Sequence, residues 1–394
     1  MSRSLPLALA ILLAAWVPLA GSCGGDGGET SDGSNGEAPD DPSRSPGWND
    51  FVRAKELEDQ ELLERALEHY RLALQKDPGT PILYVGLAGI LLRLQRLEDS
   101  SRVLAEGTAR HPDDAQLFFF QGLVLANRSL VDEAVAALLR SVELDGEDAE
   151  AWFLLGKNLY GQARVFLGSW VVDRERIAEA IDAFEHAVEL APEVPRYRFH
   201  LGQACEVAYE DEAALGHFEQ TIGLDPGHAE AHRMRGLLLR EAGRIDDALG
   251  ALRRAVELDE GEAEAHYELG LALQEAEDLG GARDAFQRAT ALDVGHHRAY
   301  FGLSKVLRRL ERDAEADAAF ARFEEWKAFD ARLQELRGLV FETPDDPELR
   351  FRLGQAYVNV RRWEEARREL GRVLMAKPDH AGARHLWQEI EDRR

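Results

Sequence analysis

Several histidines stand at spacings that could support metal chemistry. His228 and His232 lie four residues apart, a spacing that places two side chains on one face of a helix, and His266 repeats the place of His232 after 34 residues. Imidazole is a common zinc ligand, but a zinc site needs further ligands. The alternative is that these histidines belong to a repeated structural unit, which requires no metal.

The sequence around the histidines is itself repeated. HAEAHRMRGLLL at residues 228–239 returns as EAEAHYELGLAL at 262–273. We use the glycine of these two stretches, Gly236 and Gly270, as a marker of the repeat. Small residues recur at this place with spacings of 34, 34, 46, 34, 34, 34 and 50 residues: Ala88, Gly122, Gly156, Gly202, Gly236, Gly270, Ser304 and Gly354. A second small residue, such as Ala248, follows 12 residues after most markers, and Leu or Phe, such as Phe286, follows 16 residues after. Such regularity predicts a repeat architecture.

The pattern resembles the tetratricopeptide repeat, a helix-turn-helix unit of 34 residues with small residues where its two helices cross. The resemblance implies an all-α, right-handed solenoid of about nine units over residues 48–380, and a C-terminal capping helix at 381–394. It also implies a concave face, lined by the first helices, that binds protein or peptide partners.

The repeat phase gives the histidines and Cys205 structural places. His232 and His266 fall where Tyr84 and Trp152 stand in other units, a packing position between helices. His296 and His297 lie at a boundary between units. Cys205 shares its place with Leu239, which predicts a buried thiol rather than a nucleophile. We therefore predict no metal site.

Composition excludes further classes of function. The net charge of −26 opposes binding of nucleic acid. From His297 onward, however, 20 Lys and Arg face 19 Asp and Glu, so an almost neutral end follows an acidic body. No catalytic triad, phosphate-binding loop or distinctive carboxylate pair is recognisable. The sequence therefore predicts no enzymatic activity and no cofactor.

The N-terminus has the features of an export signal. Arg3 precedes an apolar segment, and small residues precede Cys23, so residues 1–22 are predicted to be a signal peptide. The stretch LAGSC at residues 19–23 resembles the lipobox of bacterial lipoproteins, which implies lipidation of Cys23, although Leu19 lies one place too early. Cleavage by an ordinary signal peptidase would release a soluble protein instead. Residues 23–47 are rich in glycine and acid, which predicts a flexible tether.

Two groups of side chains are candidates for ligand binding on the concave face. Three residues before the markers stands a row of aromatic residues: Phe119, Phe153, Phe199, Tyr267, Phe301 and Phe351. Helical geometry favours a groove contact, and packing between helices is the alternative. The second group is a basic cluster that could bind an anionic segment or pair with neighbouring acids: Arg298, Lys305, Arg308, Arg309 and Arg352. The lysine and asparagine pair by which some members of the family clamp a C-terminal carboxylate is absent.

Two irregular spacings predict local additions to the solenoid. The spacing of 46 residues indicates an insertion at 161–172, where Phe166 and Trp170 would form an exposed patch or fold back onto the solenoid. The spacing of 50 residues predicts an extra helix at about 324–341.

Taken together, the sequence predicts a non-catalytic protein-protein interaction scaffold of the bacterial cell envelope. In this interpretation the protein is anchored to a membrane through Cys23, faces the periplasm, and binds a protein or peptide in its groove. The alternative is an accessory lipoprotein of envelope assembly, acting in outer-membrane protein insertion, pilus or secretion assembly, or control of cell-wall hydrolases.

Overall fold

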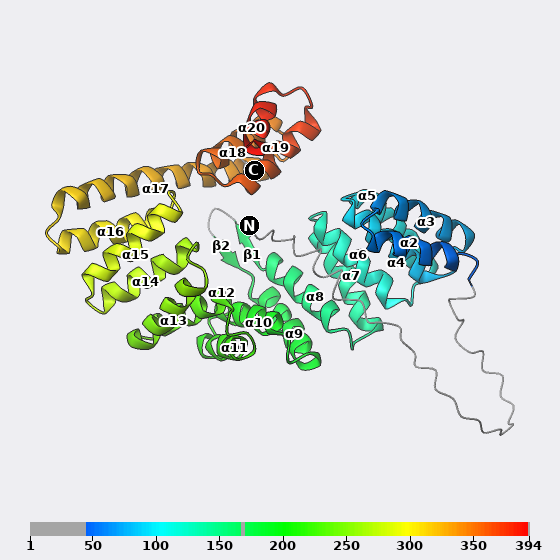
Figure 1. Cartoon of the computed structure of the whole chain (residues 1–394), viewed down its shortest axis with the longest axis horizontal. Coiled ribbons are helices and arrows are strands. Elements are labelled where there is room, and N and C mark those ends of the chain that lie inside the picture. The colour runs from blue at the N-terminus through cyan, green and yellow to red at the C-terminus, as the bar shows by residue number, and fades with distance from the viewer. Residues whose placement is uncertain (1–44, 167–169, 393–394) are drawn as a thin grey trace, which may run out of the picture. The chain divides into compact units, whose positions relative to one another are not determined.

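The computed structural model describes residues 45–166 and 170–392, and almost all of these residues are helical. Helices follow one another as antiparallel pairs, and each pair packs against the next within its unit (Figure 1). The all-α solenoid predicted from the sequence is confirmed. We call the first helix of each pair the A helix and the second the B helix.

The chain divides into two compact units. The second unit begins at Glu193 and also includes a short segment of the hairpin described below. The first unit contains helices α2 (Trp48–Asp59), α3 (Leu63–Lys76), α4 (Pro81–Arg93), α5 (Leu97–Arg110), α6 (Ala115–Asn127), α7 (Val131–Leu144), α8 (Ala149–Gln162) and α9 (Arg174–Leu190). The second contains α10 (Pro195–Val207), α11 (Asp211–Leu224), α12 (Ala229–Glu241), α13 (Ile245–Leu258), α14 (Ala263–Glu275), α15 (Leu279–Leu292), α16 (His297–Arg309), α17 (Asp313–Glu342), α18 (Pro347–Asn359), α19 (Trp363–Ala376) and α20 (Ala381–Glu391).

The small marker residues lie where the two helices of a pair cross. A Cβ atom on Gly270 would lie 2.7 Å from Cδ1 of Phe286, and one on Gly156 would lie 2.8 Å from Cδ1 of Phe184. Real Cβ atoms do not come this close to another heavy atom, so the aromatic ring of the B helix needs a glycine beneath it. The repeated pairing of a small residue on the A helix with a large one on the B helix is therefore a packing requirement.

The turn from the A helix to the B helix is also repeated. Seven residues after the marker stands a residue with a φ between 57° and 74°: Glu61, Gln95, Ser129, Tyr209, Gly243, Glu277, Glu311 and Arg361. In the second pair, the amide of Gln95 donates to the carbonyl of Leu92 (3.0 Å) and that of Arg96 to Leu91 (2.8 Å), which closes the end of the helix. Glu61 reveals a further unit at the start, with Ala54 as its marker, that the sequence markers did not include.

The histidines of the repeated stretch have a structural role. Nε2 of His266 lies 3.3 Å from the carbonyl oxygen of Glu260, and Nε2 of His232 lies 3.3 Å from that of Pro226. Trp152 donates from Nε1 to the carbonyl of Gly146 (2.9 Å) at the same place in its repeat. Each side chain thus bonds to the loop that precedes its own helix. Within the described residues, no group of three or more His, Cys, Asp or Glu is placed to hold a metal ion.

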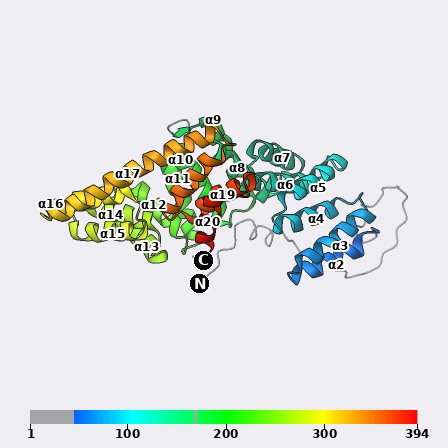
Figure 2. The ribbon, with the colours of Figure 1, turned by 90° about the horizontal axis from the view of Figure 1, so that it is seen from above.

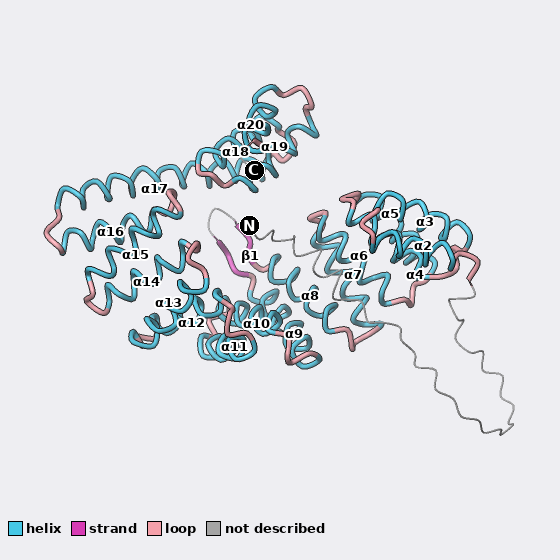
Figure 3. Tube along the Cα trace, in the orientation of Figure 1, coloured by secondary structure: helices cyan, strands magenta, loops and turns pink. Residues whose placement is uncertain are grey.

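The insertion forms a short hairpin that the sequence interpretation did not predict. Strands β1 (Arg164–Phe166) and β2 (Trp170–Val172) pair as a two-stranded sheet, drawn in magenta in Figure 3. The amide of Asp173 donates to the carbonyl of Ala163 (2.8 Å) at the base of the hairpin. The side chains of Phe166 and Trp170 lie outside the part of the molecule that the structure describes, so the choice between a patch and a folded-back insertion stays a prediction.

Helix α17 replaces the separate extra helix expected at 324–341. It is a single helix of 30 residues, prominent in Figure 2, that includes the B helix of its repeat and continues to Glu342. Ala316 and Ala319 pack with the core of α12–α16, whereas Leu333 and Val340 pack with α18–α20. No proline or glycine stands between residues 321 and 337, so nothing in this stretch of the sequence ends the helix.

Candidate protein-binding surface

Three neighbouring A helices of the second unit present a continuous charged surface. On α12 and α14, polar and apolar side chains recur every three or four residues, which places them on one face of each helix. We define the A-helix surface by nine residues: Glu230, Arg233, Leu237, Arg240, Glu264, Glu268, Leu271, Glu275 and Arg298.

Ion pairs between successive repeats join these helix faces. Nη1 of Arg240 on α12 lies 3.0 Å from Oε1 of Glu275 on α14. Nε of Arg233 lies 2.8 Å from Oε1 of Glu262, which precedes α14, and Nη1 of Arg298 on α16 lies 3.8 Å from Oε1 of Glu264. In each pair the two residues belong to successive repeats. The three faces are therefore adjacent.

Glu268 places a carboxylate in the floor of this surface. Its side chain is only 4% exposed, at a place where other repeats have Gly86, Leu154 or Met234, and its Oε2 lies 3.4 Å from Nη2 of Arg240. Burial raises the pKa of Glu268, and the nearby positive charge of Arg240 opposes that rise. The pair thus puts two desolvated charges against the apolar core of the repeats, which is costly unless they stay together.

His296 links the cap of α16 to the A-helix surface. Its Nδ1 accepts a hydrogen bond from the amide of Ala299 (3.2 Å), so Nε2 carries the proton and donates to Oε2 of Glu264 (3.0 Å). This hydrogen bond lowers the pKa of Glu264. The ring of His296 also lies 4.8 Å from that of Tyr267 on the preceding A helix.

The same arrangement is repeated at two other junctions, and the sequence interpretation missed it. His228 and His380 each accept from the backbone amide three residues later, at 3.2 and 3.1 Å. Their rings lie 4.5 Å from Phe199 and 4.6 Å from Phe351, respectively. The signal in the sequence is a histidine at a constant spacing after the aromatic residue. These histidines cap one repeat and cover the aromatic ring of the repeat before it.

The predicted aromatic row serves packing at four of its six places. Phe119, Phe153, Phe199 and Tyr267 are each no more than 6% exposed. Phe153 packs on Phe184 with ring centroids 5.9 Å apart, and Phe199 packs on Phe218 at 5.7 Å. The prediction of a groove contact is therefore wrong for these four side chains in the described structure, because the place they occupy faces the joint between repeats. Phe351 is half-buried, and only Phe301 is exposed.

The predicted basic cluster is divided by internal ion pairs. Arg308 pairs with Asp317 at 2.6 Å, and Arg309 pairs with Glu277. Arg298 pairs with Glu264, so three of the five cations have acidic partners within the protein. For these three, the alternative stated above, pairing with neighbouring acids, applies. Lys305 and Arg352 are exposed and make no ion pair among the described residues. The five side chains do not form one anion site.

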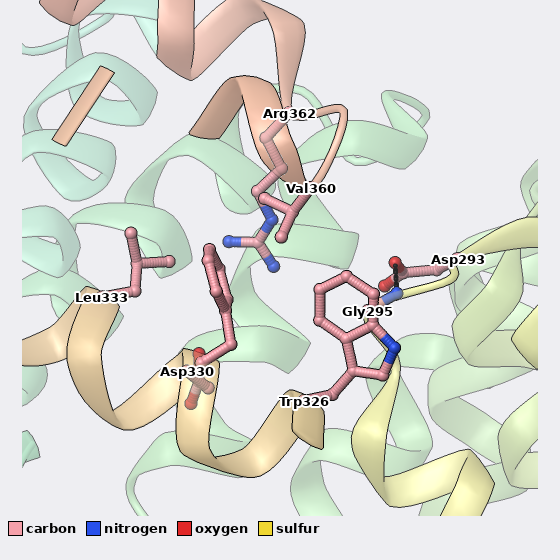
Figure 4. Close-up of a pocket in the computed structure, with 8 residues that line it drawn as sticks. Asp293, Gly295, Trp326, Asp330, Leu333, Val360 and Arg362 are labelled. Carbon is pink, nitrogen blue, oxygen red and sulfur yellow. Dashed lines mark hydrogen bonds between the residues drawn. The ribbon is translucent and has the colours of Figure 1, made fainter. Parts of the chain in front are cut away.

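A small pocket lies beside α17, but it is not a binding site for a large ligand. Figure 4 shows Arg362 and Val360 reaching toward it from the turn after α18, opposite Trp326 of α17 and the turn that contains Asp293. Its volume is about 30 Å³, which is room for no more than a few water molecules. The pocket is therefore too small for a peptide or a cofactor.

No helix in residues 45–166 and 170–392 combines the length and apolar character needed to cross a membrane. Cys205 is buried, as its place in the repeat predicts, and it forms no disulfide bond among the described residues. The predicted lipidation site, Cys23, and the predicted signal peptide lie outside the described residues.

Comparison with known proteins identifies the repeat. A family model of the tetratricopeptide repeat matches residues 57–118, and another matches 171–229, 212–263, 233–296 and 267–347. Among curated proteins, the search gave no match.

Several solved structures are similar to this chain at low sequence identity. The C-terminal part of a TPR repeat-containing protein from Cytophaga hutchinsonii is 18% identical, with a TM-score of 0.50 over 64% of this chain and 99% of that one. YrrB, a TPR protein with an unusual peptide-binding site, is 22% identical, with a TM-score of 0.42 over 50% of this chain and 95% of its own. A tetratricopeptide repeat protein from Parabacteroides merdae is 14% identical, with a TM-score of 0.45 over 66% and 99%.

The matched models, the repeated crossing of small and large residues, and the stacked helix pairs lead to one conclusion. The chain belongs to the tetratricopeptide repeat family and is built as a scaffold for protein-protein interaction.

Proposed function

We propose that this protein is a non-catalytic scaffold that binds an extended segment of a partner protein along the A-helix surface. One observation carries the proposal: α12, α14 and α16 place exposed charges and the half-buried Leu237 and Leu271 on one continuous surface. In repeat proteins of this kind the stacked first helices form an extended binding surface.

The charges on this surface favour a segment of mixed charge. The exposed carboxylate of α14 on this surface is that of Glu275, whereas α16 contributes the exposed Arg298 and contains no carboxylate. A partner would therefore place basic residues against α14 and acidic residues toward α16. Such complementarity increases the specificity and rate of association, while the two leucines supply apolar contact.

Charge substitutions on the surface test this proposal. Leu237→Glu combined with Leu271→Glu is expected to reduce recovery of the partner at least about tenfold in affinity purification, because the apolar contacts become buried charges. The matched control is Leu224→Glu combined with Met375→Glu, two exposed apolar residues off the surface, 42% and 84% exposed. The control should recover the partner as the wild type does. Equal recovery by both double variants would remove the A-helix surface as the binding site.

We propose further that the protein is exported to the bacterial cell envelope and held at a membrane by lipid on Cys23. The support is the apolar segment before LAGSC and the tether that comes after it. Metabolic labelling with palmitate should mark the wild type, and Cys23→Ser should lose both the label and the membrane fraction. An unlabelled wild-type protein released from the cell in soluble form would contradict the anchor, while leaving the A-helix surface untouched.

A further inference from the structure

The repeat formed by α16 and α17 exposes a face that is buried in the other repeats. Phe320 stands at the same place in its repeat as Phe184, Phe218, Phe286 and Leu370, which are 0–1% exposed. Phe320 is 42% exposed. Because the place in the repeat is the same, the difference arises from the element that comes next along the chain.

Phe286 shows how this place is normally covered. Its ring lies above Gly270 of its own A helix, and Gly302 of the next A helix closes over it: a Cβ atom on Gly302 would lie 2.7 Å from Cζ of Phe286. Phe320 lacks the second contact, because α17 continues as one helix instead of turning back into another A helix. The ring is therefore open on the side where the next repeat would pack.

Phe301 is uncovered for the same reason. Phe199, Tyr267 and Phe351 stand at the same place in their repeats, and each contacts the capping histidine of the next repeat. At the corresponding spacing after Phe301 stands Asp330, in the middle of α17. Phe301 is 41% exposed and lies 5.0 Å from Phe323, which in turn lies 5.5 Å from Phe320. The three rings form one apolar strip.

Two lysines border this strip. Nζ of Lys305 lies 5.5 Å from the ring centroid of Phe301, and Nζ of Lys327 lies 5.2 Å from that of Phe323. Neither lysine makes an ion pair within the described part of the chain, and α16 contains no Asp or Glu. We call Phe301, Phe320, Phe323, Lys305 and Lys327 the open face.

We propose that the open face binds an amphipathic, acidic α-helix of another protein, which takes the place of the missing A helix. The rings require an apolar stripe on the partner, and a small residue must face Phe320, as Gly302 faces Phe286. The two lysines favour carboxylates beside that stripe. None of the nine residues that define the A-helix surface belongs to the open face, although Phe301 and Lys305 stand on α16 at the repeat places that Arg233 and Leu237 hold on α12.

A peptide from this chain supplies a probe of the required chemistry. The peptide of residues 259–276 includes the A helix α14 and contains six carboxylates and no Lys or Arg. Glu268→Ala in the peptide places a small residue where Gly302 stands in α16. Fluorescence anisotropy of the labelled peptide with the full-length protein measures binding, and the same peptide with Gln in place of its acidic residues is the charge control.

The expected result is saturable binding that depends on both parts of the open face. Phe301→Ala with Phe320→Ala should weaken binding at least about tenfold, and Phe341→Ala, a 76% exposed ring off the open face, should leave it unchanged. Lys305→Glu with Lys327→Glu should weaken binding of the acidic peptide and strengthen binding of a peptide with Lys in place of its acids. Circular dichroism checks that each variant keeps its helices.

Two results would overturn the proposal. One is absence of saturable binding, or binding that is equal for the acidic and amide peptides and unaffected by the Phe301 and Phe320 changes. The other is a dimer of the wild type in light scattering that Phe320→Ala dissociates, because the occupant would then be a second copy of this chain.

Discussion

Phe286→Ala is expected to lower the free energy of unfolding of the second unit by about 3–5 kcal/mol, whereas Phe320→Ala should change it by less than about 1 kcal/mol. Both residues stand at the same place in their repeats, and both substitutions remove the same atoms. Phe286 is fully buried between two glycine-containing helices, so its loss leaves a cavity. Phe320 is 42% exposed, so water already reaches part of its ring.

Urea unfolding followed by circular dichroism of the helical signal measures the difference. The stability of stacked repeats depends mainly on contacts between neighbouring repeats. The effect of each substitution is therefore expected in the unfolding transition of the second unit. Phe218→Ala, at another buried copy of the place, serves as a control and should resemble Phe286→Ala. A loss at Phe320 as large as that at Phe286 would mean that the open face is covered in solution.

Arg240→Met is expected to destabilise the second unit by about 3–5 kcal/mol at pH 7, because it leaves the Glu268 carboxylate buried without its partner. Replacing both residues, by Arg240→Met with Glu268→Leu, should recover most of that loss, since an apolar pair of similar volume has no charge to desolvate. Arg254→Met removes an exposed pair with Glu257 and should cost less than about 1 kcal/mol. Urea unfolding of the four proteins gives the comparison.

The loss in Arg240→Met should also depend on pH. Burial raises the pKa of Glu268 in the folded state above its ordinary value of 4.5, which applies to the unfolded state. At a pH between these two pKa values, Glu268 is mostly protonated in the folded state and mostly ionised in the unfolded state. Stability of the variant should therefore increase as pH falls through the raised pKa of the folded state. A deficit that stays constant from pH 7 to pH 4.5 would show that Glu268 is not the cause.

Much of the fold was predictable because the repeat is a local packing rule. The spacing of Gly270 and Phe286 encodes the crossing of one helix pair, and copies of that spacing place nearly every helix. The structural role of His232 and His266 could be read from the same phase. Ala54 escaped detection because alanine is common and its unit begins the series, where no earlier copy sets the phase.

The candidate sites were less predictable, because they depend on contacts between repeats. The places of Tyr267 and Phe301 look identical in the sequence, yet His296 covers the first, and in the described structure no residue of a next repeat covers the second. Gly338 stands where the marker after Ser304 would fall in a regular series, but a Cβ atom there would meet nothing within 4 Å. The continuity of α17 decides the outcome, and it reflects the absence of a helix-breaking residue rather than a positive motif.

The sequence allowed the basic residues to pair with acids of neighbouring repeats, but it did not identify the partners. Arg298 and Arg309 appeared to form a basic cluster because they are close in sequence on one helix. Their partners, Glu264 and Glu277, lie one repeat earlier, and only the stacking of α14, α15 and α16 brings them together. The accessible features are a surface of mixed charge and a separate aromatic strip.

Crosslinking in living cells from a photoreactive amino acid at Leu271 tests the binding role of the A-helix surface most directly. We expect this protein to crosslink to one defined partner from position 271, in the centre of the surface, and we expect no such product from the same amino acid at Met375, which is 84% exposed and off the surface. The same crosslinked product from both positions, or none from position 271 while a partner still co-purifies with the protein, would contradict it.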